Sequence, residues 1–464
     1  MRTKESKSSS MKVKDMTEGN PIRLILLFAV PLFIGNIFQQ VYSMVDTMIA
    51  GYNLGDSAIA AIGATSSLYA LLINFASGMN TGYAIVVTQC FGAHNEDKLR
   101  KSIAGMMKLD AAAAMILTVM SLVFLKPLMR FMNIPESIFD GAYSYIAVIC
   151  AGMAATICYN MFAGIMRAVG NSRTSLYFLI LSSVLNMGMD LLFIVVLKMG
   201  IAGAALATVI AQTVSAVLCG IYVFRNYHSI LPGCRDFHIS RELFFELLSQ
   251  GLAMGLMICV VDLGSVIFQR ANNGLGETII SAHTASRRII SIMMQPLATI
   301  ASASSTFVGQ NWGAKKTDRI RSALKQVMGL ETAWALFSCV LVYAFGEMLV
   351  WFTTGTTDVG IVDNAVMSLR WHFTFFPALG CLLAMRTAMQ AMGRKAAPIA
   401  SSCVELGMKM FSAAFLIPRL GFLGTSITEP FTWAIMLLFL TTAFTLQSRR
   451  IFTGGGQRAH AQAV

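Results

Sequence analysis

Long hydrophobic segments, separated by short polar ones, run through most of this chain. An α-helix needs about 20 apolar residues to cross the ~30 Å hydrocarbon core of a bilayer, and each of these segments reaches that length. The pattern therefore predicts an all-α polytopic membrane protein with twelve transmembrane helices. The predicted helices lie at 22–50, 57–88, 103–125, 141–166, 174–197, 201–224, 244–269, 279–308, 322–346, 364–390, 396–417 and 422–446.

The composition also favours a membrane protein over a soluble one. Of the 464 residues, 56% are hydrophobic and only 12% are charged, whereas soluble domains carry about 25% charged residues. The net charge of +12 would fit a nucleic-acid-binding protein only if the basic residues gathered on one soluble face. They instead occupy loops between apolar segments, so we expect a lipid bilayer and no nucleic acid as the surroundings.

Basic residues are unevenly divided between the two sets of loops. Lys and Arg gather at both termini and in every second loop, and such loops usually stay in the cytoplasm. This pattern predicts an inner (cytoplasmic) membrane protein with both termini in the cytoplasm. The first predicted helix follows a polar tail without a small-residue cleavage site, so we expect no signal peptide. The basic residues assigned to the opposite side are Lys126, Arg130, Lys198, Arg270 and Arg419.

The two sets of six predicted helices look like copies of each other. Gly55 and Gly276 lie in similar loops 221 positions apart, and Gly92 and Gly313 repeat that interval. Copies with an even number of helices enter the membrane in the same orientation, so a pseudo-two-fold axis along the membrane normal should relate them. The predicted organisation is a cytoplasmic N-terminal tail (1–20), an N-lobe (21–224), a cytoplasmic linker (225–243), a C-lobe (244–446) and a cytoplasmic C-terminal tail (447–464).

Four polar side chains in the first half fall at one estimated depth. Asp46, Asp190 and Thr208 lie five to eight residues from the outer ends of their predicted helices, which is roughly 8 to 12 Å at 1.5 Å per residue. Asn186 lies one turn before Asp190 on the same face. An ionised side chain inside a membrane is unfavourable unless it faces a cavity or a partner, so it suggests an ion or proton pathway. We therefore expect these side chains to converge on one site.

The chemistry of these four side chains suits a small cation. Carboxylate, amide and hydroxyl oxygens are the ligands of hard cations such as Na⁺, and two carboxylates in a dry site also favour protonation of one of them. The alternative is a hydrogen-bonded network that only packs three helices together. The nine cysteines contain no CxxC motif and show no metal or disulfide pattern, so we expect no cofactor other than H⁺ or Na⁺.

The second half carries charges of both signs at comparable depth. Opposite charges can pair with each other, as Glu405 and Lys409 are spaced to do at positions i and i+4. A structural salt-bridge network and a second coupling site are therefore both open. The candidate residues of this C-lobe polar site are Asp262, Arg370, His372, Lys409 and Glu429.

The chain resembles the multidrug and toxic compound extrusion (MATE) family, within its prokaryotic DinF-like branch. The most specific matches are QQVYSMVDTMIAG at 39–51, RAVGNSRTS at 167–175 and NMGMD at 186–190. The resemblance implies two six-helix lobes around a V-shaped cavity, and export of drugs or metabolites against inward H⁺ or Na⁺ flow. It also implies a cation site at Asp46, Asn186, Asp190 and Thr208.

The resemblance also bears on individual helices. Pro31, which removes one backbone hydrogen bond and predicts a bend, matches the bending first helix of the family. Asp262 resembles the seventh-helix acid of other branches. The tenth-helix acid of those branches is missing here, where Arg370 and His372 stand instead, so a second sodium site is not implied.

The predicted function is a secondary active antiporter that exports drugs, toxins or amphipathic metabolites by alternating access of two lobes. We expect a monomer whose partners are small-molecule substrates. One alternative is a lipid-linked precursor flippase of the same superfamily, which twelve rather than fourteen helices disfavour. Another is a membrane-embedded enzyme, disfavoured because the predicted helices hold no HExxH, GxSxG or paired metal-ligand motif. We therefore expect no enzyme.

Overall fold

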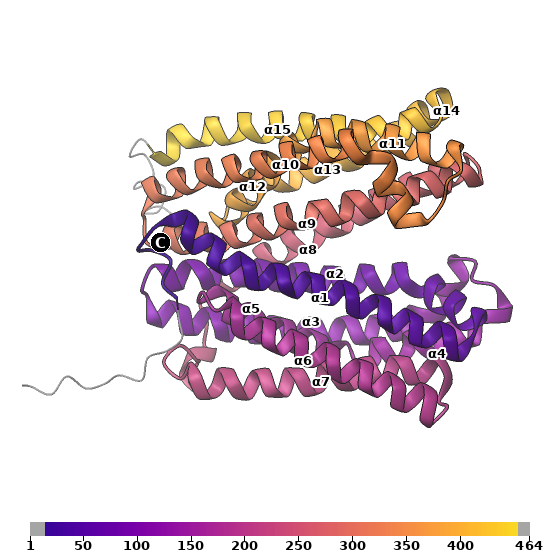
Figure 1. The fold of residues 1–464 in the computed structure, drawn as a ribbon. Coiled ribbons are helices and arrows are strands. Elements are labelled where there is room, and N and C mark those ends of the chain that lie inside the picture. The colour runs from indigo at the N-terminus through magenta and orange to yellow at the C-terminus, as the bar shows by residue number, and fades with distance from the viewer. Residues whose placement is uncertain (1–13, 453–464) are drawn as a thin grey trace, which may run out of the picture. The chain divides into compact units, whose positions relative to one another are not determined.

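The structure, a computed structural model, describes residues 14–452, and all regular elements in this range are helices (Figure 1). The first half contains α1 (Pro21–Leu54), α2 (Asp56–Gly92), α3 (Glu96–Phe131), α4 (Glu136–Ala151), α5 (Met153–Ala168), α6 (Ser172–Asp190), η1 (Leu191–Val196), α7 (Gly200–Asn226) and η2 (Cys234–Phe237). The second half contains α8 (Arg241–Asn273), α9 (Glu277–Gly313), α10 (Thr317–Thr354), α11 (Val359–Thr374), α12 (Phe376–Ala391), α13 (Ala396–Phe411), η3 (Ser412–Leu416), α14 (Ile417–Leu420) and α15 (Phe422–Phe452).

The described helices confirm an all-α polytopic membrane protein. Nine of the described segments are long and apolar enough to cross a membrane, or up to eleven when each bent pair counts as one span. The bent pairs are α4–α5, with an angle of 45°, and α11–α12, with an angle of 50°. The twelfth predicted helix, 279–308, corresponds to α9, which is 37 residues long. α9 is not among the eleven candidate membrane spans.

Residues with positive φ recur in the two halves of the chain. They lie 221 positions apart, or within two positions of that interval, which is the spacing of the repeat found in the sequence. A residue with positive φ has a left-handed backbone that few residue types adopt readily, so its repetition is informative. The irregular turns η1 and η3 also begin 221 positions apart, at Leu191 and Ser412. The halves therefore share a local framework. The repeated positive-φ pairs are Gly55 and Gly276, His94 and Lys315, Gly170 and Gly393, and Gly200 and Gly421.

The contacts of the chain divide it into two compact units. Within the described residues, the first unit comprises 14–16 and 30–255, and the second comprises 17–29 and 256–452. The division falls inside α1, between Ala29 and Val30, and inside α8, between Gly255 and Leu256. The predicted lobes instead begin and end in loops. Pro31 thus lies directly beside the point where α1 passes from one unit to the other.

The first unit is held together by close helix packing around α2. A Cβ atom at Gly82 would lie only 2.4 Å from the carbonyl oxygen of Gln250 in α8. A Cβ atom at Gly251 would lie 2.2 Å from the ring of Tyr83. Glycine is required at both positions because any side chain would push α2 and α8 apart. A larger core of α2, α3, α5 and α7 residues includes the buried Ile103 and Ile165.

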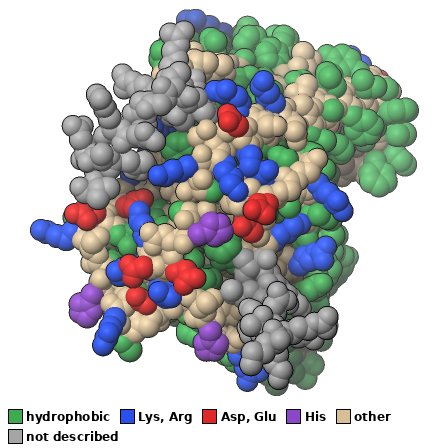
Figure 2. Space-filling view, turned by 90° about the vertical axis from the view of Figure 1, so that its left-hand side faces the viewer, with side chains coloured by type: hydrophobic (Ala, Val, Ile, Leu, Met, Phe, Trp, Pro, Cys, Tyr) green, Lys and Arg blue, Asp and Glu red, His purple; other side chains and the backbone are tan. Residues whose placement is uncertain are grey.

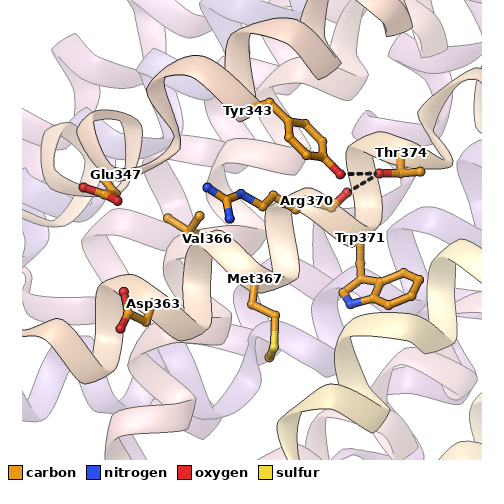
Figure 3. Close-up of a pocket in the computed structure, with 8 residues that line it drawn as sticks. All are labelled: Tyr343, Glu347, Asp363, Val366, Met367, Arg370, Trp371 and Thr374. Carbon is orange, nitrogen blue, oxygen red and sulfur yellow. Dashed lines mark hydrogen bonds between the residues drawn. The ribbon is translucent and has the colours of Figure 1, made fainter.

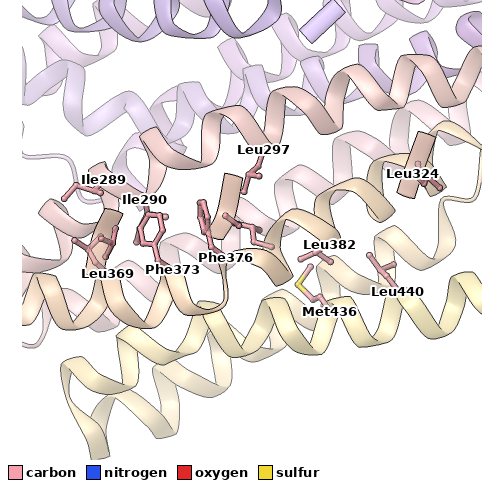
Figure 4. Close-up of a cluster of buried hydrophobic side chains, with 14 of the residues drawn as sticks. Ile289, Ile290, Leu297, Leu324, Leu369, Phe373, Phe376, Leu382, Met436 and Leu440 are labelled. Atoms are coloured by element: carbon pink, nitrogen blue, oxygen red, sulfur yellow. The ribbon is translucent and has the colours of Figure 1, made fainter. Parts of the chain in front are cut away.

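The second unit has its own hydrophobic core (Figure 4). The rings of Phe373 and Phe376 lie 4.6 Å apart between centroids and flank the break between α11 and α12. Aromatic packing holds the two helices together at the bend, and Pro377, the second residue of α12, lies directly after it. The other labelled side chains come from α9, α10, α11, α12 and α15: Ile289, Ile290, Leu297, Leu324, Leu369, Leu382, Met436 and Leu440.

Charged side chains gather at one end of the helices (Figure 2). This is the end at which α1 begins, and Lys and Arg lie there among Asp, Glu and His. In the first unit, Lys98 Nζ lies 3.2 Å from Glu246 Oε2 and Lys101 Nζ lies 2.7 Å from Asp97 Oδ2. These pairs are exposed and therefore contribute little stability. They mark the end of the first unit that sequence charge assigns to the cytoplasm.

Candidate cation-coupling site

The first-half candidates come from three helices. Asp46 lies on α1 eight residues before Leu54, and Asp190 is the last residue of α6. Asp190 is fully buried, whereas Asp46 is partly exposed. Asn186 is 2% exposed and lies one turn before Asp190, and Thr208 lies on α7. The irregular turn η1 follows Asp190 directly, so this carboxyl sits where regular helix geometry ends.

The carboxyl groups of Asp46 and Asp190 lie within hydrogen-bonding distance of each other. Two ionised carboxylates repel at such a distance, and burial further disfavours charge. A proton or another cation between the two carboxyl groups would relieve this repulsion. Asp190 Oδ1 is buried and has no hydrogen-bond partner among the described residues. One acceptor of the pair is thus open to such a cation.

Asn186 links Asp190 to α7. With its amide oriented to satisfy both neighbours, its nitrogen donates to Asp190 Oδ2 over 3.0 Å and to the Tyr42 hydroxyl over 3.2 Å. Its oxygen accepts from Thr208 Oγ1 over 3.2 Å and from Thr208 N over 3.1 Å. This orientation is assigned from the hydrogen-bond network. Asn186 therefore fixes the height of Asp190 relative to α7.

A small cavity adjoins Asn186 and Thr208. Its volume is about 30 Å³, which is enough for a water molecule or a small ion. Gln212 on α7 lines it with a buried Oε1 atom that has no partner among the described residues. The sequence prediction missed this glutamine and Gln39, although both lie within helices already assigned to the site.

Three tyrosines surround the acid pair. Tyr42 on α1, Tyr69 on α2 and Tyr145 on α4 all lie within electrostatic range of Asp46. Their hydroxyl groups supply neutral hydrogen-bonding atoms and no positive charge. Tyr42 was detectable from sequence because it lies one turn before Asp46. The other two were not, because they come from helices without a charged marker at that depth.

The second-half candidates form an ion-pair network centred on Glu429 of α15. Arg287 of α9 lies 2.6 Å from Glu429 Oε2, His372 Nε2 of α11 lies 3.5 Å from the same oxygen, and Lys409 of α13 lies 4.0 Å from Oε1. Lys409 also lies 2.9 Å from Glu405 Oε1. Glu429 therefore has its counter-charges built into the protein.

The other two candidates are placed differently. Asp262 lies on α8 one turn before Ser265, whose hydroxyl accepts a hydrogen bond from Lys409 over 3.0 Å. Arg370 lies over the ring of Tyr343 at 5.7 Å and lines a cavity of about 570 Å³ between α10 and α11 (Figure 3). The structure thus brings His372, Lys409 and Glu429 together and places Arg370 at another cavity.

The family follows from a comparison along the chain. A family model described as MatE matches residues 31–192 and, a second time, residues 253–415. The chain belongs to the MatE family. Because the two matched segments of this MATE chain begin 222 positions apart, they correspond to the two halves found from the sequence. Both acids of the first-half pair lie in the first matched segment.

The chain is also similar to known multidrug resistance proteins and MATE structures over most of its length. "Probable multidrug resistance protein YoeA" of Bacillus subtilis (strain 168) is 26% identical over 429 residues, covering 90% of this chain and 92% of that protein. "Probable multidrug resistance protein YpnP" of the same organism is 27% identical over 394 residues, covering 82% and 85%. An outward-facing MATE transporter structure shares 20% identity with a TM-score of 0.84, covering 95% and 99%. This likeness confirms a MATE fold.

Proposed function

We propose that this MATE protein is a cation-coupled antiporter that exports small amphipathic molecules across the cytoplasmic membrane. The contact between the carboxyl groups of Asp46 and Asp190 carries the proposal. The names of the curated relatives, which are probable multidrug resistance proteins, support the substrate class. The proposed protein works as a monomer with both termini in the cytoplasm, and inward flow of H⁺ or Na⁺ drives export.

The coupling step is neutralisation of the acid pair. A proton or Na⁺ bound between Asp46 and Asp190 holds α1 and α6 together, because it removes the repulsion between two buried carboxylates. Loss of the cation leaves that repulsion unopposed. Asn186 donates both to Asp190 and to Tyr42 of α1, and we take α1 as the element that responds because it contains Pro31. The oxygen atoms of Asp46, Asn186, Asp190 and Thr208 are of the type that binds Na⁺, and Na⁺ binding by all four would require the Asn186 amide to turn its oxygen from Thr208 toward Asp190.

Pro31 gives α1 a point at which to respond. Proline has no N–H group and cannot complete the usual hydrogen bond to the preceding turn, which weakens a helix there. The division between the two contact units lies one residue away, at Ala29 and Val30. The cation therefore acts by binding more tightly to one bend of α1 than to the other. Substrate is released in the conformation that binds the cation.

Efflux from proteoliposomes under separately imposed proton and sodium gradients tests this function. Ethidium serves as the probe once wild-type efflux has been established. We expect Asp46→Asn and Asp190→Asn each to reduce gradient-driven efflux by at least about tenfold, within the range of coupling between ligand sites. The matched control is Asp140→Asn, an exposed acid of α4, which should behave as wild type. Full gradient-driven efflux by both site variants would contradict the proposal.

A further inference from the structure

A second set of buried acids lies outside the site described above. Asp110 of α3 is 3% exposed and Glu331 of α10 is 0% exposed. The two residues are 221 positions apart, and each lies fourteen residues after the start of its helix. That spacing places both about 21 Å along their helices. They are therefore equivalent positions in the two halves of the chain.

The surroundings of Asp110 leave several polar atoms without partners. Asn80 of α2 lies within hydrogen-bonding reach of Asp110, and Tyr83 of α2 and Cys158 of α5 lie within electrostatic range. Asp110 Oδ2, Asn80 Oδ1 and the Tyr83 hydroxyl are all buried without a hydrogen-bond partner among the described residues. No basic side chain in the described part of the chain forms an ion pair with Asp110.

A proton on Asp110 accounts for this arrangement. The Asn80 amide nitrogen donates to the carbonyl oxygen of Ala76 over 3.3 Å, and its second N–H can donate to Asp110. An ionised carboxylate only accepts hydrogen bonds, whereas a protonated carboxyl has one O–H donor. Protonation of Asp110 therefore supplies a donor among the unpaired oxygen atoms nearby and removes a buried charge without a counter-ion, which is strongly unfavourable inside a protein.

Close packing seals the Asp110 site. Gly82, which lies between Asn80 and Tyr83 on α2, allows the backbone at Gln250 to approach, and Gly251 contacts the Tyr83 ring. Gln250 Oε1 is also buried without a partner in the described chain. Three helices of the first unit thus close around several polar atoms that the surrounding side chains leave unsatisfied. Such groups are normally hydrogen-bonded.

Glu331 repeats this construction in the second unit. Both of its carboxyl oxygens are buried and lack hydrogen-bond partners among the described residues. A Cβ atom at Gly380 of α12 would lie 3.0 Å from the Glu331 Cβ atom, so α12 packs directly on this position. Burial, rather than a neighbouring charge, is the main influence on the carboxyl group of Glu331. Ser304, which is 221 positions after Tyr83, likewise has a buried hydroxyl without a partner in the described residues.

The recurrence of these acids contrasts with the divergence of the halves elsewhere. At the same 221-residue interval, Asp190 corresponds to Phe411 and Thr208 corresponds to Glu429. The polar character of the first site has therefore changed completely between the halves. At the buried positions 110 and 331, by contrast, both halves have an acid. It is the shorter Asp side chain in the first half and the longer Glu side chain in the second.

We infer that Asp110 and Glu331 are two proton-binding sites, one in each half, that hold their protons in this conformation and release them when water reaches them. Along the helix axes, Asp110 lies about 20 Å farther from the outer end of the first unit than Asp46 does. A proton leaving the outer pair toward the cytoplasm could therefore use Asp110 next. That route rests on the proposed function, whereas proton binding at Asp110 and Glu331 does not.

Infrared difference spectroscopy of the full-length reconstituted protein, titrated with pH, tests the inference directly. Protonated carboxyl groups give a carbonyl-stretch band that carboxylates lack. We expect Asp110→Asn and Glu331→Gln each to remove one such band from the neutral-pH spectrum, and Asp140→Asn to remove none. Asn80→Ala keeps the acid but removes its hydrogen-bond partner, so it should shift the Asp110 band. Spectra of both acid variants that match wild type would overturn the inference.

Two further outcomes separate this inference from the proposed function. If Asp110→Asn does not fold, Asp110→Glu retains the acid and should move its band, while an unchanged band would count against the inference. If the bands are assigned but Asp46→Asn and Asp190→Asn retain full gradient-driven efflux, the proposed function fails and proton binding at Asp110 stands. If Asp110 lies on the route, Asp110→Asn should lower proton-driven efflux by about fivefold or more and leave ethidium binding at fixed pH unchanged.

Discussion

In the first half of the chain, Asp46 and Asp190 meet each other among neutral side chains, whereas in the second half Glu429 is surrounded by basic ones. Asp190 contacts Asn186, and both acids lie near Tyr42, so a cation that neutralises them would come from solution. Glu429 already has Arg287 at 2.6 Å. The same helical framework therefore carries the proposed cation site in one half and an ion-pair network in the other.

This comparison favours one of the two interpretations of the second half. A coupling site must change its charge during transport, but Glu429 shares three basic neighbours that the protein supplies itself. The charge of Glu429 is therefore compensated without a cation from solution. We interpret the network as structural, and the positions of Thr208 and Glu429, which are equivalent in the two halves, as the point where the halves diverged.

The largest expected effect is on the stability of the second-half network. Glu429→Gln leaves the buried Lys409 without one of its acids and Arg287 without its partner. Breaking a buried ion pair by removing one member usually costs about 3 to 5 kcal/mol, and we expect the lower end because Arg287 is half exposed. Thermal unfolding in detergent measures this loss. Glu347→Gln, an exposed acid of α10, is the control, and equal stability of the two variants would refute the structural interpretation.

The helices were predictable from sequence because apolar length and charged loops depend only on local composition. The repeat was predictable for a related reason, since left-handed residues such as Gly55 and Gly276 are required wherever the chain turns in the same way. The break between α4 and α5 was not predictable, because the apolar pattern continues through Gly152 and no proline lies there. The break between α11 and α12 at Phe375 had a signal in Pro377, the second residue of α12, which the sequence prediction did not use.

The sequence predicted how deep each site residue lies in the membrane, but not the side of its helix to which the side chain points. Counting residues from a helix end gives the height of Asp46 or Asp190, and these two also meet in the structure. It does not give the side of the helix. Arg370 and His372 have nearly the same height, yet two residues turn a helix by about 200°, so His372 reaches Glu429 while Arg370 lines the cavity beside Tyr343 (Figure 3).

The next largest effect concerns the bend of α1 in the first half. Pro31→Ala restores a backbone hydrogen bond and removes a steric clash in the helix, so α1 should become straighter and stiffer. We expect gradient-driven efflux of ethidium to fall by about tenfold, with no loss of thermal stability. Pro127→Ala, in α3, provides a matched proline control that should keep its efflux. Wild-type efflux by Pro31→Ala would show that the bend is not used.

A smaller effect is expected from the hydroxyl that supports the acid pair. Thr208→Val keeps the shape of the side chain but removes the donor to Asn186, so the amide of Asn186 becomes less well fixed. A typical hydrogen bond contributes about 1 kcal/mol, which corresponds to about a fivefold weaker apparent affinity for the coupling ion. The concentration of H⁺ or Na⁺ that gives half-maximal efflux measures this shift. Thr208→Ser should restore most of it, and failure to restore it would implicate packing instead.

The smallest expected effect separates the two halves most clearly. Asp190→Asn removes one of two carboxyl groups that repel each other, so the thermal stability should stay within about 1 kcal/mol of wild type or increase. The same isosteric change of acid to amide at Glu429 should destabilise the protein. Parallel thermal unfolding of both variants in one detergent makes the comparison. If Asp190→Asn lowered the thermal stability as much as Glu429→Gln, the first-half acid would also have a fixed partner of opposite charge. Neutralising a buried charge destabilises a protein strongly only when that charge was paired.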